Sequence, residues 1–138
     1  MAKIIFINLP VKNLERSLQL YTQMGVTINP AFTDNHQKCV MWGEHIYVML
    51  QSHEMFQSHI KKEIPDMHQF QTASYTLPMD SLEQMNETME KALRAGGKEP
   101  VPMIDEGFMQ IRVLEDFDGH TWSFIYLDMN KFERMKER

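Results

Sequence analysis

Apolar and polar residues alternate with two different periods along this chain, and the order of the periods repeats. Residues 3–10 and 72–78 are dense in strand-forming residues, and each run ends at a proline, which cannot donate to a sheet ladder. Residues 14–24 and 82–93 then carry apolar side chains at helical spacing and run into glycine. Further strand-like runs follow each helix. They lie at residues 26–32, 38–42 and 46–50 in the first half, and around 99–104, at 108–115 and at 121–127 in the second.

A repeated phrase marks the junction of strand and helix in each half. NLPVKNLE at residues 8–15 returns as TLPMDSLE at residues 76–83. We predict that Asn13 caps the first helix and that Asp80 caps the second, with Glu83 completing a capping box. The pattern therefore predicts an α+β fold of two tandem β-α-β-β-β modules.

The length of the chain sets the domain organisation. A chain of 138 residues fits one compact unit that can bury a core. We expect a single domain, residues 1–138. Its expected parts are module one at 1–52, a linker with a short helix at 53–70, module two at 71–128 and a charged helical tail at 129–138.

Composition excludes several classes of partner. The 14 basic and 19 acidic residues give a net charge of −5, which argues against a nucleic-acid binder and against binding to anionic membrane. No apolar run approaches the ~18 residues of a membrane span, and the N-terminal apolar run is too short for a signal peptide. Cys39 is the single cysteine, which fits a reducing cytoplasm and is more typical of a small buried residue than of a nucleophile. We expect a cytoplasmic protein without nucleic-acid or membrane partners.

Two stretches carry a resemblance to a known family. LPVKNLERSLQLYTQMG resembles the opening strand and helix of the vicinal oxygen chelate superfamily, the glyoxalase, bleomycin-resistance and extradiol-dioxygenase group, and VLEDFDGHTW resembles its closing hairpin. GFMQIRVLEDFDGHTW resembles the branch called predicted lactoylglutathione lyases. The resemblance implies that the curled sheets of the two modules enclose one cavity. It also implies a divalent metal there, held by His and Glu from the first and last strands of each module.

The four positions that match those ligands are occupied by other residue types. They are Phe6, Met49, Ser74 and Ser123. Phenylalanine offers no lone pair, thioether is too soft for such ions, and a neutral hydroxyl is a weak ligand. We therefore predict no metal and no cofactor at these positions.

Histidines elsewhere do not suggest a replacement metal site. His53 and His59 are six residues apart, which places them on different faces of a helix. His45 and His120 follow the two hairpin turns, where they are expected to satisfy turn carbonyls.

Strand alternation predicts which side chains line the cavity. The helix-facing positions are apolar throughout, whereas the opposite positions mix hydroxyls, amides, aromatics and one arginine, which favours a ligand cavity over a closed core. The alternative is that this sheet face meets water. The expected ligand-binding residues are Phe6, Asn8, Tyr47, Met49, Thr72, Ser74, Gln110, Arg112, Thr121 and Ser123.

Arg112 is the cationic residue of this set. A planar guanidinium suits a carboxylate or phosphate, so we expect Arg112 to recognise an anionic or carbonyl-bearing ligand. The alternatives are that it pairs with an acid such as Glu115 or Asp116, or that its strand is turned over.

Three classes of function stay open at this point. The first is a metal-free small-molecule binding protein, akin to the antibiotic-sequestering members of the resembled group. The second is a lactoylglutathione lyase-like or dioxygenase-like enzyme that uses a metal on other ligands, and the third is an interaction protein with a vestigial cavity. The missing ligands favour the first class. Because curled sheets leave open strand edges, we also expect a homodimer.

Overall fold

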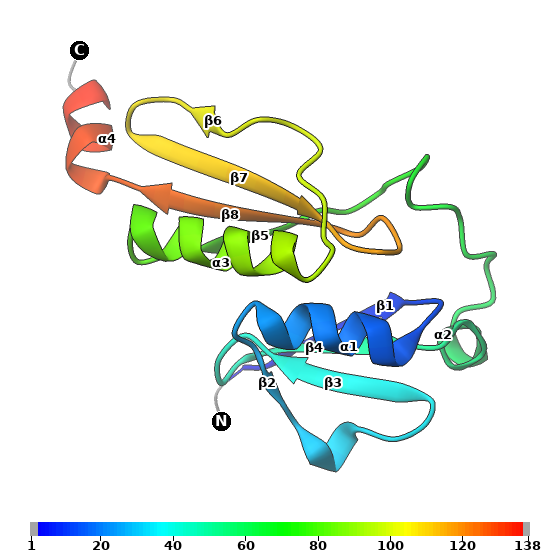
Figure 1. Cartoon of the computed structure of the whole chain (residues 1–138). Coiled ribbons are helices and arrows are strands. Elements are labelled where there is room, and N and C mark those ends of the chain that lie inside the picture. The colour runs from blue at the N-terminus through cyan, green and yellow to red at the C-terminus, as the bar shows by residue number, and fades with distance from the viewer. Residues whose placement is uncertain (1–2, 137–138) are drawn as a thin grey trace.

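The first module combines one four-stranded sheet with one long helix. The structure is a computed structural model and describes residues 3–136. The elements of this module are β1 (Ile5–Pro10), α1 (Leu14–Gln23), β2 (Thr27–Ile28), the 3-10 helix η1 (Pro30–Phe32), β3 (Gln37–Met41) and β4 (Ile46–Gln51). The sheet has the order β1-β4-β3-β2, with β1 parallel to β4 (Figure 1). The short helix α2 (His53–His59) follows.

The second module repeats this plan. Its elements are β5 (Tyr75–Pro78), α3 (Leu82–Arg94), β6 (Ile104–Asp105), β7 (Met109–Glu115) and β8 (Thr121–Leu127). The strand order β5-β8-β7-β6 matches that of the first sheet element by element, and β5 is parallel to β8. Helix α4 (Met129–Lys136) projects beyond the sheet. The prediction of an α+β fold with two tandem modules is confirmed.

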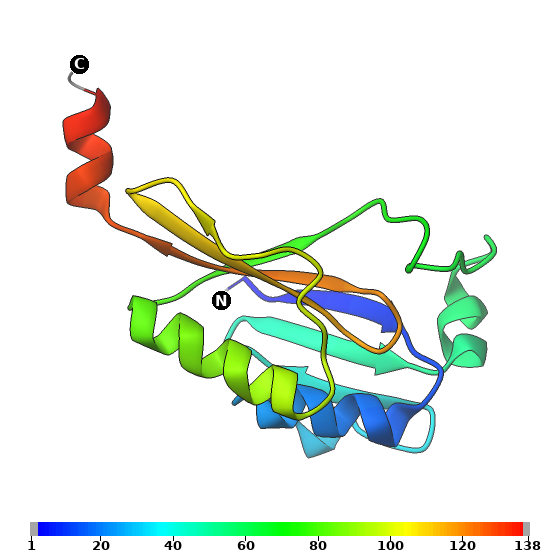
Figure 2. The same cartoon turned by 45° about the horizontal axis from the view of Figure 1, so that its top comes forward.

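Both long helices cover the same side of the two sheets. Figures 1 and 2 show α1 and α3 next to each other in one layer, with the strands of both modules behind them. We call the covered side of the sheets the helix face and the opposite side the open face. One hydrophobic core lies between the helices and the helix face, with contributions from both modules. Its fully buried members include Leu9, Leu20, Val48, Leu50, Met85, Met89, Leu114, Trp122 and Phe124.

The helix caps follow the sequence prediction in α1 and differ from it in α3. Asn13 accepts a hydrogen bond from the Arg16 N–H at 3.0 Å, as expected. In α3 the cap is Ser81, which accepts from the Gln84 N–H, while the Gln84 side chain accepts from the Asp80 N–H. The predicted cap at Asp80 with Glu83 is therefore wrong by one residue, because Ser81 is the cap and the side chain of Gln84 accepts from the N–H of the residue before Ser81.

The turn between β7 and β8 ties the second module to the first. One carboxylate oxygen of Asp116 accepts from the backbone N–H groups of Asp118 and His120, and the other accepts from the Tyr21 hydroxyl at 2.7 Å. The His120 imidazole donates to the Pro10 carbonyl oxygen at 2.8 Å. His120 was expected to satisfy a carbonyl of its own turn, but it bonds to the carbonyl at the end of β1 in the other module. Burial raises the pKa of the Asp116 carboxyl and of the Tyr21 phenol.

Candidate functional site

In the first module the predicted site residues lie on the open face. Phe6 is opposite Tyr47, and Asn8 is opposite Met49. The intervening Ile7, Leu9, Val48 and Leu50 belong to the core on the helix face or pack against it. Because successive strand residues point to opposite faces, the four predicted residues share one side of the sheet.

In the second module the hydroxyl-bearing residues also lie on the open face. Ser123 is opposite Thr76 on β5 and Val113 on β7, and its neighbours Trp122 and Phe124 are in the core. Thr121 is opposite Glu115 and donates to the Gln71 side-chain oxygen at 2.7 Å. Ser74 and Thr72 are exposed residues that precede β5, and they lie outside the paired positions of that strand.

Gln110 and Arg112 are on the other side of the sheet, so their predicted placement is wrong. Arg112 is opposite Phe124 and Gln110 is opposite Tyr126, and residues directly opposite in an antiparallel pair point the same way. Phe124 is a fully buried core residue on the helix face. The residues of β7 that reach the open face are Met109, Ile111, Val113 and Glu115.

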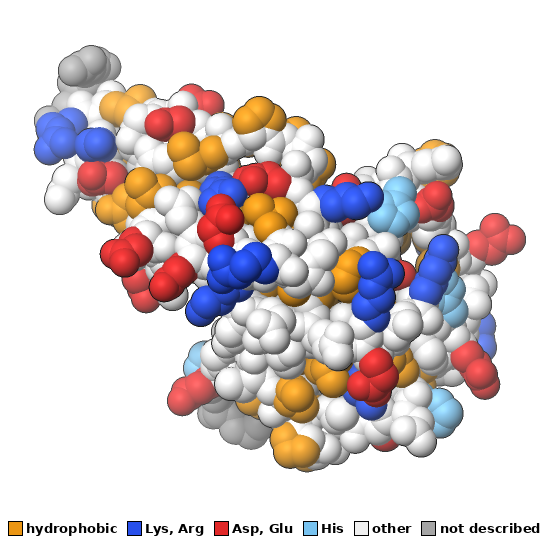
Figure 3. Space-filling view, viewed as in Figure 1, with side chains coloured by type: hydrophobic (Ala, Val, Ile, Leu, Met, Phe, Trp, Pro, Cys, Tyr) orange, Lys and Arg blue, Asp and Glu red, His pale blue; other side chains and the backbone are white. Residues whose placement is uncertain are grey.

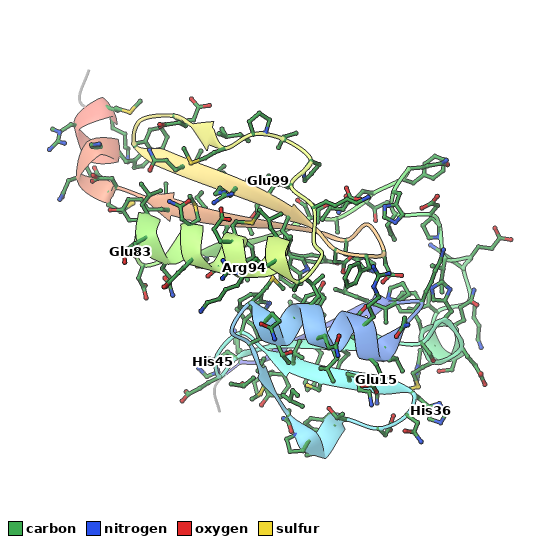
Figure 4. The ribbon with its side chains drawn as sticks, in the orientation of Figure 1. Glu15, His36, His45, Glu83, Arg94 and Glu99 are labelled. Carbon is green, nitrogen blue, oxygen red and sulfur yellow. The ribbon has the colours of Figure 1, made fainter. Side chains whose placement is uncertain are left out.

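Acidic residues of the second module neutralise Arg112 on the helix face. Its Nε and Nη2 donate to the two carboxylate oxygens of Glu99, each at 2.9 Å, and its Nη1 donates to Glu90 at 3.1 Å and to Asn86 at 3.2 Å. Figure 4 shows Glu99 over β7. The Arg112 side chain is 13% exposed, and its hydrogen bonds lower the pKa of Glu99. The arginine therefore has a structural set of partners, and the reason to expect an anionic ligand is removed.

An aromatic cluster is the main feature of the open face in the first module. The ring of Phe6 lies edge-on to those of Tyr47 and Phe32, with centroid distances of 4.8 and 5.9 Å. Phe6 is 47% exposed and Phe32 is 45% exposed, so both rings present surface to a ligand. Beneath the cluster, Met49 and Cys39 are buried.

Phe32 was not among the predicted site residues because residues 26–32 were expected to form one strand. The strand ends at Ile28, and η1 turns Phe32 over the sheet. Asn29 accepts a hydrogen bond from the Ala31 N–H and so starts this turn. The Asn29-Pro30 dipeptide is a turn signal that could have identified it.

The open face carries little charge. Glu115 is the charged side chain at its strand positions within residues 3–136, and its carboxylate lies 2.8 Å from the His68 Nδ1 of the linker. This hydrogen bond raises the pKa of His68. Burial raises the pKa of the Cys39 thiol, which disfavours the thiolate that a nucleophile needs. Hydroxyls, amides, thioethers, aromatic rings and aliphatic side chains such as Ile111 and Val113 make up the rest.

The residues present do not fit a divalent metal. Phe6 and Met49 in the first module, and Ser74 and Ser123 in the second, occupy the positions where the resembled enzymes place His and Glu, and none is a ligand that such ions prefer. Within residues 3–136 no three or more His, Cys, Asp or Glu side chains gather as a metal site. His36 and His45 lie at opposite ends of the first sheet (Figure 4).

Charges of both signs are mixed on the molecular surface. On the face in Figure 3, Lys and Arg side chains are interspersed with Asp and Glu. Among residues 3–136 no helix has the length and apolarity that a membrane crossing requires.

Strand order, helix placement and the paired modules together define the glyoxalase/bleomycin resistance fold. The hypothetical protein SA1046 from S. aureus superposes with a TM-score of 0.77 at 22% identity, over 91% of this chain and 94% of that one. A glyoxalase/bleomycin resistance protein/dioxygenase family enzyme from Burkholderia phytofirmans gives 0.73 at 13% identity, over 91% and 99%. A glyoxalase-related enzyme from Fulvimarina pelagi gives 0.76 at 16% identity, over 91% and 88%. No protein-family model and no curated protein sequence matches this chain.

Proposed function

We propose that this chain is a cytoplasmic, metal-free small-molecule binding protein of the vicinal oxygen chelate superfamily, with its ligand on the open face. The observation that carries the proposal is the aromatic cluster of Phe6, Phe32 and Tyr47, which occupies the region where a metal ligand is expected. An exposed aromatic surface gives binding energy without catalytic chemistry. The hydroxyls of Ser74 and Ser123 supply orienting hydrogen bonds rather than metal coordination.

The ligand that fits this face is neutral and contains an aromatic ring. With Arg112 on the helix face, an anion would lose its hydration without gaining a cationic partner, which is costly. A planar ring can stack on Phe6 and Phe32, and hydroxyl or carbonyl groups can bond to Ser123 and Thr76. This replaces the anionic ligand that the sequence suggested.

A second copy of the chain completes the site in this proposal. In one chain the open face is not enclosed, and β1 and β5 are unpaired along one edge within their sheets. Ile4, which precedes β1, and Ile5, its first residue, are 46% and 55% exposed, which is unusual for isoleucines. A homodimer would cover this edge and turn the open face into an enclosed cavity.

A comparison of two phenylalanine variants tests the proposal. A screen of neutral aromatic compounds by thermal shift and calorimetry is run on wild type, Phe32→Ala and Phe70→Ala. Phe70 is 63% exposed in the linker and serves as the matched control. We expect neutral aromatic hits whose affinity falls about tenfold or more in Phe32→Ala and is unchanged in Phe70→Ala, because a lost stacking contact costs roughly 0.5–1.5 kcal/mol beyond its buried area. Hits that bind Phe32→Ala with undiminished affinity would contradict a site on the open face.

A further inference from the structure

A separate cavity opens on the helix side, where the two modules meet. Its volume is about 460 Å³, which lies in the range of small-molecule sites. Three turns converge on it. Gly25 follows α1, Trp42 begins the turn between β3 and β4, and residues 78–80 lead into α3. None of the ten residues expected to bind ligand lines this cavity.

Two polar groups at this cavity lack partners. The buried indole N–H of Trp42 has no hydrogen-bond partner within residues 3–136. Thr88 of α3 is 9% exposed and lines the same cavity, yet none of the hydrogen bonds in the described part of the chain involves its hydroxyl. The usual outcome for a helical threonine is seen at Thr22, which donates to the Leu18 carbonyl oxygen at 2.9 Å. An unpaired buried polar group is costly, so the Trp42 N–H is a candidate for contact with a ligand. The Thr88 hydroxyl is not one of the fully buried unpaired groups of the described residues, so it is accessible to a ligand in the cavity.

The lining of the cavity combines apolar residues with polar residues of α3 and of the turn before it. Met24, Ile46, Leu77 and Met79 contribute apolar surface, and Trp42 packs on the core rings of Trp122 and Phe124 with centroid distances of 5.9 Å.

Charges at the mouth select against an anion. Asp80 and Glu87 are two acids that line the cavity, against one base, Lys91. A carboxylate ligand would meet this net negative rim, whereas a neutral carbonyl oxygen would accept from Trp42 and Thr88 without that penalty. The Trp42 indole N–H and the Thr88 hydroxyl can each donate a hydrogen bond, which suits a hydrogen-bond acceptor on the ligand.

We propose that this cavity between the modules is a second binding site, which takes an uncharged and mostly apolar molecule with a carbonyl oxygen. The proposal is independent of the site on the open face, since it rests on different residues on the opposite side of the sheets.

The indole signals of the two tryptophans give a direct test. Trp122 already donates its N–H to the Tyr21 hydroxyl at 2.8 Å, so its signal is an internal reference. ¹H–¹⁵N spectra are recorded during titration with acetophenone, 2-acetonaphthone and 2-naphthoate, with Trp42→Phe to assign the signals. We expect the two ketones to move the Trp42 indole resonance saturably and to leave that of Trp122 in place, and we expect 2-naphthoate to bind at least several-fold more weakly than 2-acetonaphthone.

Matched threonine variants locate the contact. Thr88→Val keeps the shape of the side chain and removes the hydroxyl, and we expect it to weaken ketone binding about three- to tenfold, the loss of one neutral hydrogen bond. Thr22→Val on α1 and Phe32→Ala on the open face should leave the ketone affinity measured at the Trp42 resonance unchanged. The proposal is overturned if neither ketone moves the Trp42 signal, if 2-naphthoate binds more tightly than the ketones, or if Thr88→Val binds as well as wild type. Ketone affinity lost in Phe32→Ala alone would overturn it while supporting the site on the open face.

Discussion

At the scale of single residues, a buried chain of hydrogen bonds joins the modules. Trp122 donates to the Tyr21 hydroxyl, which donates to Asp116, whose other oxygen holds the turn between β7 and β8. All of these side chains are buried. Removal of a middle member leaves both neighbours unsatisfied, which costs more than the loss of an isolated hydrogen bond.

Tyr21→Phe is therefore expected to lower the free energy of unfolding by about 2 kcal/mol, within the range for groups left unpaired in a core. Urea denaturation at neutral pH measures this change in the free energy of unfolding. Tyr126→Phe is the control, because no hydrogen bond of its hydroxyl occurs in residues 3–136 and its ring is partly exposed. A Tyr21→Phe protein as stable as Tyr126→Phe would show that the chain of hydrogen bonds is not stabilising.

Arg112 gives a prediction that depends on pH. Arg112→Ala leaves the Glu99 carboxylate without its cationic partner at the edge of the core. We expect the free energy of unfolding to fall by about 2 kcal/mol at pH 7, since hydrogen bonds to charged groups contribute about 1.5–3 kcal/mol. The pKa of Glu99 is lowered from 4.5 in the folded protein, so the stabilisation is present above pH 4.5 and is lost as the pH falls through the lowered value.

The measured difference between wild type and Arg112→Ala should therefore shrink as the pH falls below 4.5. Denaturation curves recorded between pH 7 and pH 3 measure this difference in the free energy of unfolding. Arg94→Ala is the control, because no salt bridge of Arg94 occurs within residues 3–136. A difference that stays constant over this range would assign the effect to packing rather than to the ion pair.

At the scale of elements, the sequence predicts the helices, the succession of strands in each module and most of the open face, but not the phase of β7. Residues 108–115 hold apolar and polar side chains in both phases, so alternation alone does not decide which set faces the core. The turn through Asp116 and Gly119 decides it, because it pairs Leu114 with Trp122 and therefore Arg112 with Phe124. Counting outward from this turn would have placed Arg112 on the helix face. Phe32 was missed for a related reason, since only the turn at Asn29 brings it over the sheet.

The linker is held to the same turn. His68 contacts Glu115 at 2.8 Å and the Phe117 carbonyl oxygen at 3.2 Å. Gly119, with φ of 92°, lets the linker backbone come so close that a side-chain carbon there would lie 2.6 Å from the Met67 carbonyl carbon. The part of the linker around Met67 and His68 therefore packs against the turn between β7 and β8.

The contact between His68 and Glu115 predicts a shifted titration of His68. The Glu115 hydrogen bond raises the pKa of His68 above 6.5, so its stabilisation is full below pH 6.5 and is lost as the pH rises through the raised value. Titration by NMR should give this raised pKa in wild type, a lower one in Glu115→Gln and no change in Glu106→Gln. An unchanged His68 titration in Glu115→Gln would mean that the contact does not persist in solution.

At the scale of the whole molecule, the open face and the free strand edges lead to the prediction of a homodimer. Ile5→Asp places a charge on the exposed edge of β1, and we expect it to convert a dimer into a monomer without loss of fold, because Ile5 is 55% exposed in one chain. Size-exclusion chromatography with light scattering measures the mass, and circular dichroism checks the fold. Ile28→Asp on β2, 44% exposed, is the control and should stay dimeric. A wild-type protein that is monomeric at micromolar concentration would contradict the proposal.

We propose that this protein binds its ligand without the metal of the enzymes that its fold resembles. The most direct measurement is elemental analysis of tag-free protein after incubation with Ni²⁺, Zn²⁺, Mn²⁺ and Fe²⁺ and removal of free ions. We predict far less than one ion per chain, because Phe6, Met49, Ser74 and Ser123 cannot assemble a coordination sphere for these metals. About one ion per chain, released when Ser74 and Ser123 are both changed to alanine, would contradict it.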